Sequence, residues 1–543
     1  MNRKTKFLLY VLLYVLLFIT LFNIDLFAQQ DSISKLIDFQ TKKFKSILEA
    51  MYEYSKDTID IYTVSDSAFA SMLRSSSEFN AYFPKSEWSR YFNTTQGKTV
   101  SIGLSIKLLG DTIFIFDVDK NSPAELAGIK RGNVLFSVND IKVTKNNVND
   151  INKSLFVQEG DSIVVKWMDY NSLELKTATL ICKEYMVPSI TANFILKKDS
   201  ILFVKIDNFS IETGAEIKKI SNELKNEKIK GIIIDLRNNA GGTLNTVISA
   251  LDEFINKGDT VFKSFARKDE FKYNLTSKGN GSFLKIPLIV LINNKSASGS
   301  EIFAGAIQDL DRGIIIGEKS FGKGTMQKTW SLVDTTGYRI TVAEFVTPSD
   351  RIIDKNSKSN KKHLLDTTTK IDEQLALTNK KAYDELNEKI KKGEFVTNVN
   401  IVYTKRKKRP IMANGGIQPD IIVIEDTLNL LTRVLANNGI LIEFIFKNTN
   451  LFPKSNVDVN DFIFNYKVSD ELLENFKVFS YNEKHIWNDE MYKQDKEFIR
   501  NKFKAYIAHY LWGKNIFNAV EAVNNNVVQQ ALINKSKAID ILK

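Results

Sequence analysis

The spacing of apolar residues changes several times along the chain and divides it into parts. In residues 33–54 apolar side chains recur about every 3.6 positions, which predicts a helix within an N-terminal region of residues 29–98. In residues 99–185 apolar and polar positions alternate, which predicts a small β-rich module. Its expected strands are residues 101–106, 112–118, 134–138 and 162–167.

Residues 186–426 show a different pattern, in which short apolar runs bounded by glycine alternate with helical stretches. Such runs predict strands that are buried on both faces of an α/β layer structure. The expected strands are residues 201–206, 231–236, 288–292, 313–317 and 421–424, and the expected helices are residues 213–226, 243–257 and 299–309.

Two further parts are more polar or more helical. Residues 351–410 are irregular, with one expected helix near residues 371–392, and are interpreted as an insertion in the α/β part. Residues 427–543 are rich in helical patterns, such as residues 496–511. This C-terminal region could cap the α/β part, mediate dimers or bind a partner.

The N-terminus has the features of an export signal. Arg3, Lys4 and Lys6 precede the apolar residues 7–22, and Ala28 suits the position before a cleavage site. We therefore expect residues 1–28 to be a signal peptide and the rest to be exported to the periplasm or cell envelope. The apolar segment is slightly long, so an uncleaved inner-membrane anchor is the alternative.

Composition excludes several classes of function. The net charge of +11 comes from lysines scattered among acidic residues, so we expect no nucleic-acid partner. The densest basic run, residues 405–409, is interpreted as a solvated loop. The single cysteine, Cys182, lies in an alternating apolar segment and is interpreted as a buried structural thiol. No Cys/His metal pattern is present, so no metal site is expected.

Three segments that follow predicted strands carry the candidate chemistry. Residues 293–301 form a serine-rich turn before a helix, where free N–H groups and the helix dipole favour a nucleophile, although an ordinary helix cap looks the same. In residues 317–327, Lys323 lies between two glycines, and close packing there would disfavour its charged form. Residues 235–242 enter a glycine turn that would bring a backbone N–H close to a reacting carbonyl. Taken singly, the last two are equally typical of a surface lysine and a tight turn.

In this order, the three segments resemble the motifs of the carboxyl-terminal processing (tail-specific) protease family. The family pattern is D-L-R-x-N-x-G-G, then S-A-S-x-S-E-I, then G-x-x-x-F-G-K-G-x-x-Q, and the chain matches all three. Lys323 follows Ser298 by 25 positions, as in the family. The resemblance covers roughly residues 75–425 and is specific because the motifs occur as an ordered set.

The resemblance implies a serine peptidase that needs no cofactor. Ser298 would be the nucleophile, Lys323 its general base, and Gln327 the residue that orients the lysine. The backbone N–H groups of Gly242 and Gly299 would form the oxyanion hole. The family usually has alanine where this chain has Gly299.

Two charged residues, Arg237 and Glu301, also match motif positions. They are interpreted as scaffold charges, with an ion pair between them as one option.

The β-rich module, residues 99–185, resembles the PDZ domain that this family carries. Residues 101–106 match its carboxylate-binding loop, in which the N–H groups of Ile102, Gly103 and Leu104 would hold a substrate's C-terminal carboxylate. Leu104 and Ile106 would line an apolar pocket. In some family members an arginine couples peptide binding to activation, but this chain has Phe156-Val157-Gln158-Glu159-Gly160 at that place. The resemblance therefore does not support coupling between peptide binding and activation in this chain.

The implied fold is a multidomain α/β protein. It has a crotonase/ClpP-like peptidase core in residues 186–426, a β-rich PDZ domain in residues 99–185, and helical regions in residues 29–98 and 427–543. The implied function is that of an exported serine endopeptidase that cleaves protein or peptide substrates near their C-termini by a Ser-Lys dyad. The helical flanks offer sites for a homo-oligomer.

Three rival functions are less favoured. A catalytically inactive, secreted binding scaffold of the same fold is disfavoured by the intact Ser298, Lys323 and Gln327. A Ser-His-Asp triad is disfavoured because the three histidines occur in no recognisable motif. A crotonase-type acyl-CoA enzyme is disfavoured by the export signal and the PDZ-like module.

Overall fold

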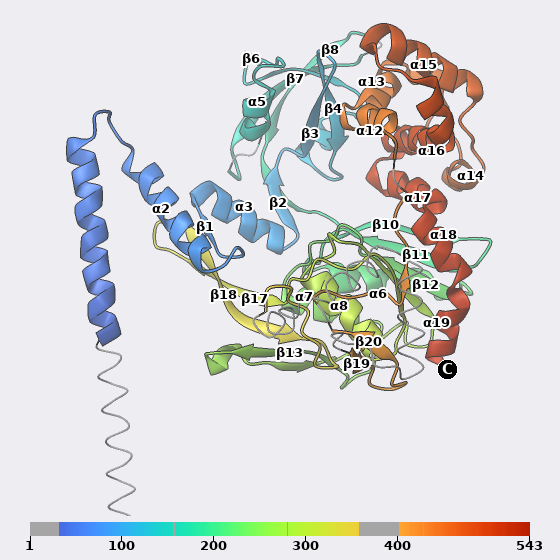
Figure 1. The fold of residues 1–543 in the computed structure, drawn as a ribbon. Coiled ribbons are helices and arrows are strands. Elements are labelled where there is room, and N and C mark those ends of the chain that lie inside the picture. The colour runs from blue at the N-terminus through green and yellow to red at the C-terminus, as the bar shows by residue number, and fades with distance from the viewer. Residues whose placement is uncertain are drawn as a thin grey trace, which may run out of the picture. The chain divides into compact units, whose positions relative to one another are not determined.

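The computed structural model describes residues 32–543 except residues 156–157, 171, 280, 358–400, 414 and 427. The expected signal peptide, most of the expected insertion with its helix, and Phe156 and Val157 lie outside the described residues. The chain forms two compact units (Figure 1). The small unit comprises Met1–Pro84 and Thr329–Ile340, and the large unit comprises Lys85–Lys328 and Thr341–Lys543.

Helices dominate the small unit. The helix expected over residues 33–54 is present, and α2 (Ile61–Ser76) follows it, beginning at the capping residue Asp60. Strand β1 (Ala81–Phe83) pairs antiparallel with the first residues of β18 (Gly337–Val346). The ring of Phe69 lies 5.9 Å from that of Phe44 and 5.4 Å from that of Tyr82, so aromatic contacts join the two helices and the strand.

A six-stranded sheet forms the centre of the large unit. The strand order is β10-β11-β12-β15-β16-β21, in which β10 is antiparallel to β11 and the other neighbours are parallel. The strands are β10 (Ile190–Leu196), β11 (Ile201–Ile206), β12 (Gly231–Asp235), β15 (Leu288–Ile292), β16 (Ile314–Gly317) and β21 (Ile421–Ile422). The apolar runs therefore predicted five of these six strands, to within one or two residues at most ends, whereas β10 was not predicted.

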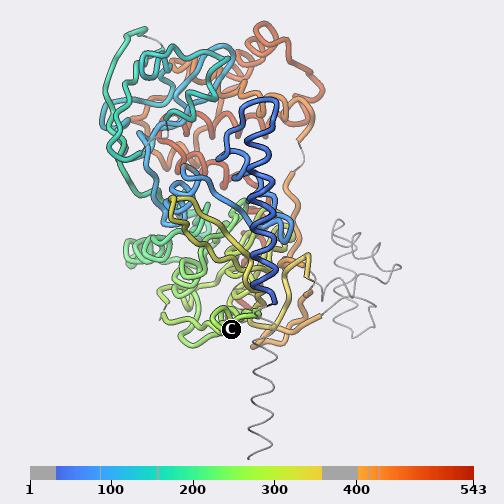
Figure 2. Tube along the Cα trace, turned by 90° about the vertical axis from the view of Figure 1, so that its left-hand side faces the viewer, coloured from blue at the N-terminus to red at the C-terminus, as the bar shows by residue number. Residues whose placement is uncertain are grey.

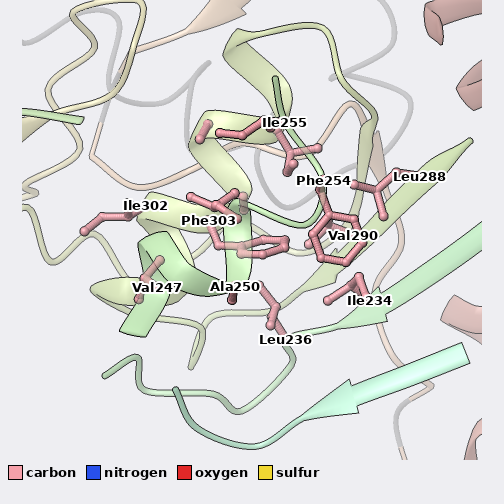
Figure 3. Packing of buried hydrophobic residues seen from close by; sticks show 14 of the residues in the cluster. Ile234, Leu236, Val247, Ala250, Phe254, Ile255, Leu288, Val290, Ile302 and Phe303 are labelled. Atoms are coloured by element: carbon pink, nitrogen blue, oxygen red, sulfur yellow. The ribbon is translucent and has the colours of Figure 1, made fainter. Parts of the chain in front are cut away.

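One face of this sheet packs against α6 (Thr213–Glu223), α7 (Leu244–Leu251) and α8 (Gly299–Asp309). Figure 3 shows Phe254 and Phe303 against Ile234 and Val290 of the sheet. This layer places the N-terminus of α8 beside the carboxyl ends of the parallel strands, where sites in open α/β sheets usually form.

The other face of the sheet packs against the C-terminal end of the chain. Phe203, Ile233 and Leu291 point into a cluster with small residues of α18 (Asn526–Ile533) and α19 (Lys535–Leu542). Of the three roles left open for the C-terminal region, the structure shows the capping one. The sheet is buried on both faces only because these helices cover it.

A second sheet lies at the edge of the large unit. Strand β13 (Thr260–Ala266) pairs antiparallel with β14 (Asn274–Thr276) and with β18, and β17 (Thr325–Ser331) also pairs with β18. Strand β17 begins two residues after Lys323 and includes the last residues of the candidate lysine segment.

The β-rich module has its own sheet, ordered β3-β4-β5-β7-β8, with β6 (Ile141–Lys142) beside β5. Its strands are β3 (Leu104–Leu109), β4 (Thr112–Val118), β5 (Val134–Val138), β7 (Ser162–Met168) and β8 (Leu175–Ile181). Two short helices, α4 (Pro123–Leu126) and α5 (Val148–Ser154), complete it. Cys182 is 1% exposed in the module's core, which confirms the predicted buried thiol.

The strand expected over residues 101–106 is divided in two. Strand β2 (Lys98–Ser101) ends before Gly103 and pairs with β9 (Lys183–Met186), whereas β3 begins after it. Gly103 has a φ of +82°, in the left-handed region that glycine adopts without strain, and this turn redirects the chain.

The remaining C-terminal helices share an apolar cluster with the β-rich module, and α17 also packs against β10 of the central sheet. They are α12 (Leu430–Asn437), α13 (Ile440–Lys447), α14 (Val459–Phe464), α15 (Asp470–Lys484), α16 (Asp489–Trp512) and α17 (Lys514–Asn524). Leu109 and Phe114 of the module share one apolar cluster with Phe444, Phe446 and Phe503. Figures 1 and 2 both show these helices beside the module's strands. Among the described residues, no helix is both long and apolar enough to cross a bilayer.

The interpretation of residues 405–409 as a solvated loop is wrong in part. Arg406 donates from Nη2 to both carboxylate oxygens of Asp259, and Arg409 binds both Asp311 and Asp420. Asp259 and Asp311 come from segments distant in sequence, so the local run of like charges gave no sign of them.

Candidate active site

Ser298 lies in the turn between β15 and α8. It is half-buried between the buried residues Ala297 and Gly299, and its φ of 53° and ψ of −109° are strained for a residue with a side chain. An ordinary helix cap has extended backbone angles instead. A strained serine in a sharp strand-to-helix turn is the arrangement that presents the nucleophile in other hydrolases. The backbone therefore favours the nucleophile interpretation over the simple cap.

The glycine turn after β12 lies directly against this serine turn. A Cβ atom added at Gly241 would lie 2.6 Å from the Gly299 nitrogen, and one added at Gly299 would lie 3.0 Å from the Gly242 nitrogen. Gly299 is the first residue of α8, so its N–H has no acceptor within its own helix. The two predicted oxyanion donors thus come from neighbouring backbone segments.

Hydrogen bonds join these two turns. The N–H of Ala297 and the hydroxyl of Ser300 both donate to the carbonyl of Asn239, at 3.0 and 2.8 Å. The hydroxyl of Ser296 donates to the carbonyl of Leu236 at 2.8 Å. Ser296 and Ser300 therefore hold the scaffold around Ser298.

Asn293 is a further link that the sequence interpretation missed. Its Oδ1 accepts from the Asn238 N–H at 2.9 Å, and its Nδ2 donates to the Asn238 Oδ1 at 3.1 Å. Asn238 has a φ of 64°, a conformation that asparagine tolerates better than most residues. A polar residue immediately after a fully buried strand was the available signal.

The Glu301 carboxylate connects the serine turn and the lysine segment by hydrogen bonds. Its side chain is fully buried, and its Oε1 accepts from the Ser320 hydroxyl at 2.6 Å and the Gly322 N–H at 2.7 Å. Its Oε2 accepts from the N–H groups of Ser298 at 2.8 Å and Lys323 at 2.9 Å. Burial raises the pKa of Glu301, and the four donors partly counteract this rise. An ion pair between Glu301 and Arg237 is not what the structure shows.

Lys323 is brought to Ser298 through this carboxylate, because both backbones donate to the same oxygen atom. Lys323 is half-buried between the buried residues Gly322 and Gly324. A Cβ atom at Gly324 would lie 2.5 Å from the Asp354 nitrogen, so the close packing expected around the lysine is present.

Gln327 lies on β17, and its Nε2 donates to Thr325 Oγ1 at 2.9 Å and to the Thr325 carbonyl at 3.2 Å. Its role in orienting Lys323 stays a prediction.

Arg237 begins the glycine turn and is 7% exposed. Its Nε and Nη2 donate to the two carboxylate oxygens of Asp235 at 2.9 and 2.7 Å, and its Nη1 donates to Glu425. Burial by itself would raise the pKa of Asp235, but Arg237 and Lys205 outweigh it and lower the pKa to about 2. The arginine therefore pairs with Asp235 and Glu425.

The predicted carboxylate-binding loop is tightly packed. Ile102 is 0% exposed and Leu104 is 7% exposed, and both lie in the module's own core rather than in an open pocket. The Gly103 N–H donates to the Ser101 hydroxyl at 3.0 Å. A peptide carboxylate would compete with that hydroxyl. Ile106, on β3, is half-buried beside the same core.

The two described histidines contact residues other than those of the candidate site. The ring of His509 stacks 4.5 Å from that of Phe116, with its Nε2 3.5 Å from Asp117. His485 ends α15 in a left-handed conformation. His363 lies outside the described residues.

Comparisons with known proteins show similarity to peptidases. Residues 200–359 match the model of peptidase family S41, and residues 431–513 match a family of unknown function (DUF8443). A probable CtpA-like serine protease of Staphylococcus aureus is 27% identical over 308 residues, which is 56% of this chain and 60% of the relative. A carboxy-terminal-processing protease of Bartonella bacilliformis is 28% identical over 317 residues, which is 57% of this chain and 71% of the relative. The aligned part thus spans less than two thirds of the Staphylococcus protein.

Solved structures are also similar. The photosystem II D1 C-terminal processing protease is 24% identical, with a TM-score of 0.33, over 56% of this chain and 83% of that protein. A putative S41 protease of Bacteroides fragilis is 16% identical, with a TM-score of 0.38, over 64% of this chain and 97% of that protein.

Proposed function

We propose that this chain is a serine endopeptidase that cleaves protein substrates near their C-termini through a Ser298–Lys323 dyad. The match of residues 200–359 to the model of peptidase family S41 and the similarity to two processing proteases support this proposal. We also propose that the part of the chain around the six-stranded sheet has a crotonase/ClpP-like fold.

In the proposed mechanism, neutral Lys323 removes the hydroxyl proton of Ser298 as the serine oxygen attacks the substrate's peptide carbonyl. The N–H groups of Gly242 and Gly299 stabilise the oxyanion. Lys323 then gives the proton to the leaving amine as the C–N bond breaks. Lys323 next removes a proton from a water molecule that attacks the acyl-enzyme, and it returns this proton to the Ser298 oxygen as the ester C–O bond breaks. The reaction uses no metal ion and no organic cofactor.

One observation supports this assignment most strongly. Ser298 occupies a strained turn, and the carboxylate oxygen that binds its N–H also binds the N–H of Lys323. Backbone strain at Ser298 costs stability, and strain of this kind is typical of active sites. Holding the strained serine and a half-buried lysine on one buried acceptor therefore favours a catalytic role.

The test is a peptidase assay with the exported part of the chain. We expect Ser298→Ala and Lys323→Ala to abolish cleavage, and a serine-reactive probe to label the wild type but not Ser298→Ala. The exposed Ser282 and Lys328 provide matched controls, and Ser282→Ala and Lys328→Ala should cleave normally. Full activity in Ser298→Ala would refute the dyad, and absence of labelling in the wild type would favour the inactive scaffold.

We also propose that the β-rich module is a PDZ domain that binds substrate tails along β3. Strand β3 ends the strand order of its sheet, and the left-handed turn at Gly103 precedes it, as a carboxylate-binding loop requires. Amidation of a peptide's C-terminus should therefore raise KM about ten-fold or more and leave kcat nearly unchanged. Equal KM values for the free and amidated peptides would contradict tail docking.

Export and assembly belong to the proposal as well. N-terminal sequencing of the protein from the cell envelope should give Gln29 as the first residue, whereas an intact N-terminus in the membrane fraction would favour the anchor.

In the helix of residues 32–54, Ile33, Ile37 and Ile47 are more than half exposed, so a second copy could cover them. Light scattering of the exported part would report the oligomeric mass.

A further inference from the structure

A charged cluster lies beneath the glycine turn that would supply an oxyanion donor. Lys205 bridges Asp207 and Asp235 at 3.8 and 3.7 Å, and its ammonium also donates to the carbonyl of Arg237 at 3.3 Å. Asp235 is 1% exposed and Arg237 is 7% exposed, so this cluster is largely shielded from water.

Helix α17 contacts the cluster at both of its ends. Lys514, its first residue, binds Asp207 at 2.6 Å. Asn525, immediately after its last residue, accepts from Arg237 Nη1 at 2.7 Å. The same Asn525 oxygen caps α18 by accepting from the N–H groups of Val527 and Val528 at 3.0 and 3.3 Å.

Arg237 depends on Asn525 for its remaining donor group. Asp235 occupies Nε and Nη2, which leaves Nη1 for Glu425 and Asn525. The Glu425 side chain is 45% exposed, so solvent weakens its hold, whereas Asn525 is fixed at a helix junction. A buried guanidinium with an unsatisfied donor would shift, and its own backbone leads into the turn with Gly242.

Building on the proposed function, we propose that Asn525 is a positioning residue for the peptidase reaction. It fixes the Arg237 side chain and thereby the turn that carries the Gly242 N–H. Asn525 lies outside both residues 200–359 and residues 431–513, so the C-terminal end of the chain completes a site that the peptidase domain does not complete by itself.

Two substitutions at this position separate positioning from helix capping. Serine is as good a cap as asparagine, but its hydroxyl ends closer to the backbone and would not reach Arg237. Aspartate keeps both the cap and an acceptor for Arg237. We expect Asn525→Ser to lower kcat roughly ten-fold or more while KM and the melting temperature change little. Asn525→Asp should keep kcat within about two-fold of wild type, since both contacts persist.

Asn518 provides a matched control on the same helix. Its amide donates to Thr191 of the central sheet at 3.2 and 3.0 Å and not to the charged cluster. Asn518→Ala should lower stability at least as much as Asn525→Ser without a fall in kcat. A wild-type kcat in Asn525→Ser, or an equal fall in Asn518→Ala, would overturn the inference.

A second measurement does not depend on activity. Hydrogen exchange in residues 237–243 should be faster in Asn525→Ser than in the wild type and normal in Asn525→Asp. If the wild type shows no Ser298-dependent cleavage, the proposed function fails, yet this exchange pattern still decides whether Asn525 holds the turn. Unchanged exchange in Asn525→Ser would refute the positioning role even if the peptidase is active.

Discussion

At position 299 the chain has glycine where the tail-specific protease family usually has alanine, and the surrounding packing explains the difference. A Cβ atom at Gly299 would lie 2.7 Å from Val247 Cγ2, which is closer than atoms in real structures approach. Val247 is fully buried on α7, and Figure 3 shows it beside the end of α8 (Ile302 is labelled there). The valine therefore fills the space that an alanine methyl group would need.

We expect Gly299→Ala to lower kcat about ten-fold or more, because the methyl group would push the Gly299 N–H away from the Gly242 N–H. Val247→Ala opens the missing space, so the double variant Gly299→Ala/Val247→Ala should recover much of the lost activity. Steady-state kinetics of the two single variants and the double variant form the test. Purely additive losses would show that the two positions do not compete for space.

The hydrogen bonds around Glu301 require a carboxylate at this position. Four donors converge on its two oxygens, so Glu301→Gln keeps the shape but replaces one oxygen by an NH2 group that faces at least one N–H donor. We expect a loss of unfolding free energy of about 1–3 kcal/mol and a fall in kcat of more than ten-fold. Urea unfolding and peptide cleavage are the measurements, with the exposed Glu223→Gln as control. Near-normal kcat in Glu301→Gln would mean that the dyad does not need this carboxylate.

Single residues were predictable where their signal is local and were not where their partners are distant. The motifs indicated Ser298, Lys323 and the glycines, because each occupies a short turn after a buried strand. Two partners of Arg237 were beyond prediction, since Glu425 and Asn525 lie far along the chain.

At the scale of elements, apolar runs predicted the inner strands of the central sheet well, because strands such as β12 and β15 are buried on both faces, whereas the partly exposed edge strand β10 was missed. The same pattern could not reveal what covers the second face, because α18 and α19 are built mostly from small and polar residues. The division between β2 and β3 was also missed, since one glycine with a left-handed backbone interrupts an otherwise regular alternation.

The covering role of α18 gives a prediction at this scale. Val528 is fully buried against the sheet, whereas Gln529 is exposed on the same helix. We expect Val528→Asp to lower the free energy of unfolding by several kcal/mol, because an unpaired carboxylate would be buried against apolar strands. Gln529→Asp should have little effect. Thermal and urea unfolding would measure both, and equal stabilities would show that α18 does not seal the core.

At the scale of the large unit, the C-terminal region packs against two different parts of the chain. Helices α12–α16 share an apolar cluster with the β-rich module, whereas α18 and α19 cover the central six-stranded sheet. The residues that match DUF8443, 431–513, fall within α12–α16 and the start of the turn after them. The matched region is thus the part that packs on the module.

This shared cluster predicts that the module and helices α12–α16 unfold as one cooperative unit. Phe446 of α13 is 1% exposed, and its ring packs edge-on against that of Phe114 in β4, 5.5 Å away. Phe446→Ala should therefore cost about 3–5 kcal/mol and accelerate hydrogen exchange in β3 and β4 as much as in α13. Tyr481→Ala, at a 63% exposed position on α15, is the control and should change neither. If Phe446→Ala loosens α13 but leaves the β-rich module protected, the two fold independently. A substrate tail bound to the module, as proposed, could then not act through these helices on the central six-stranded sheet.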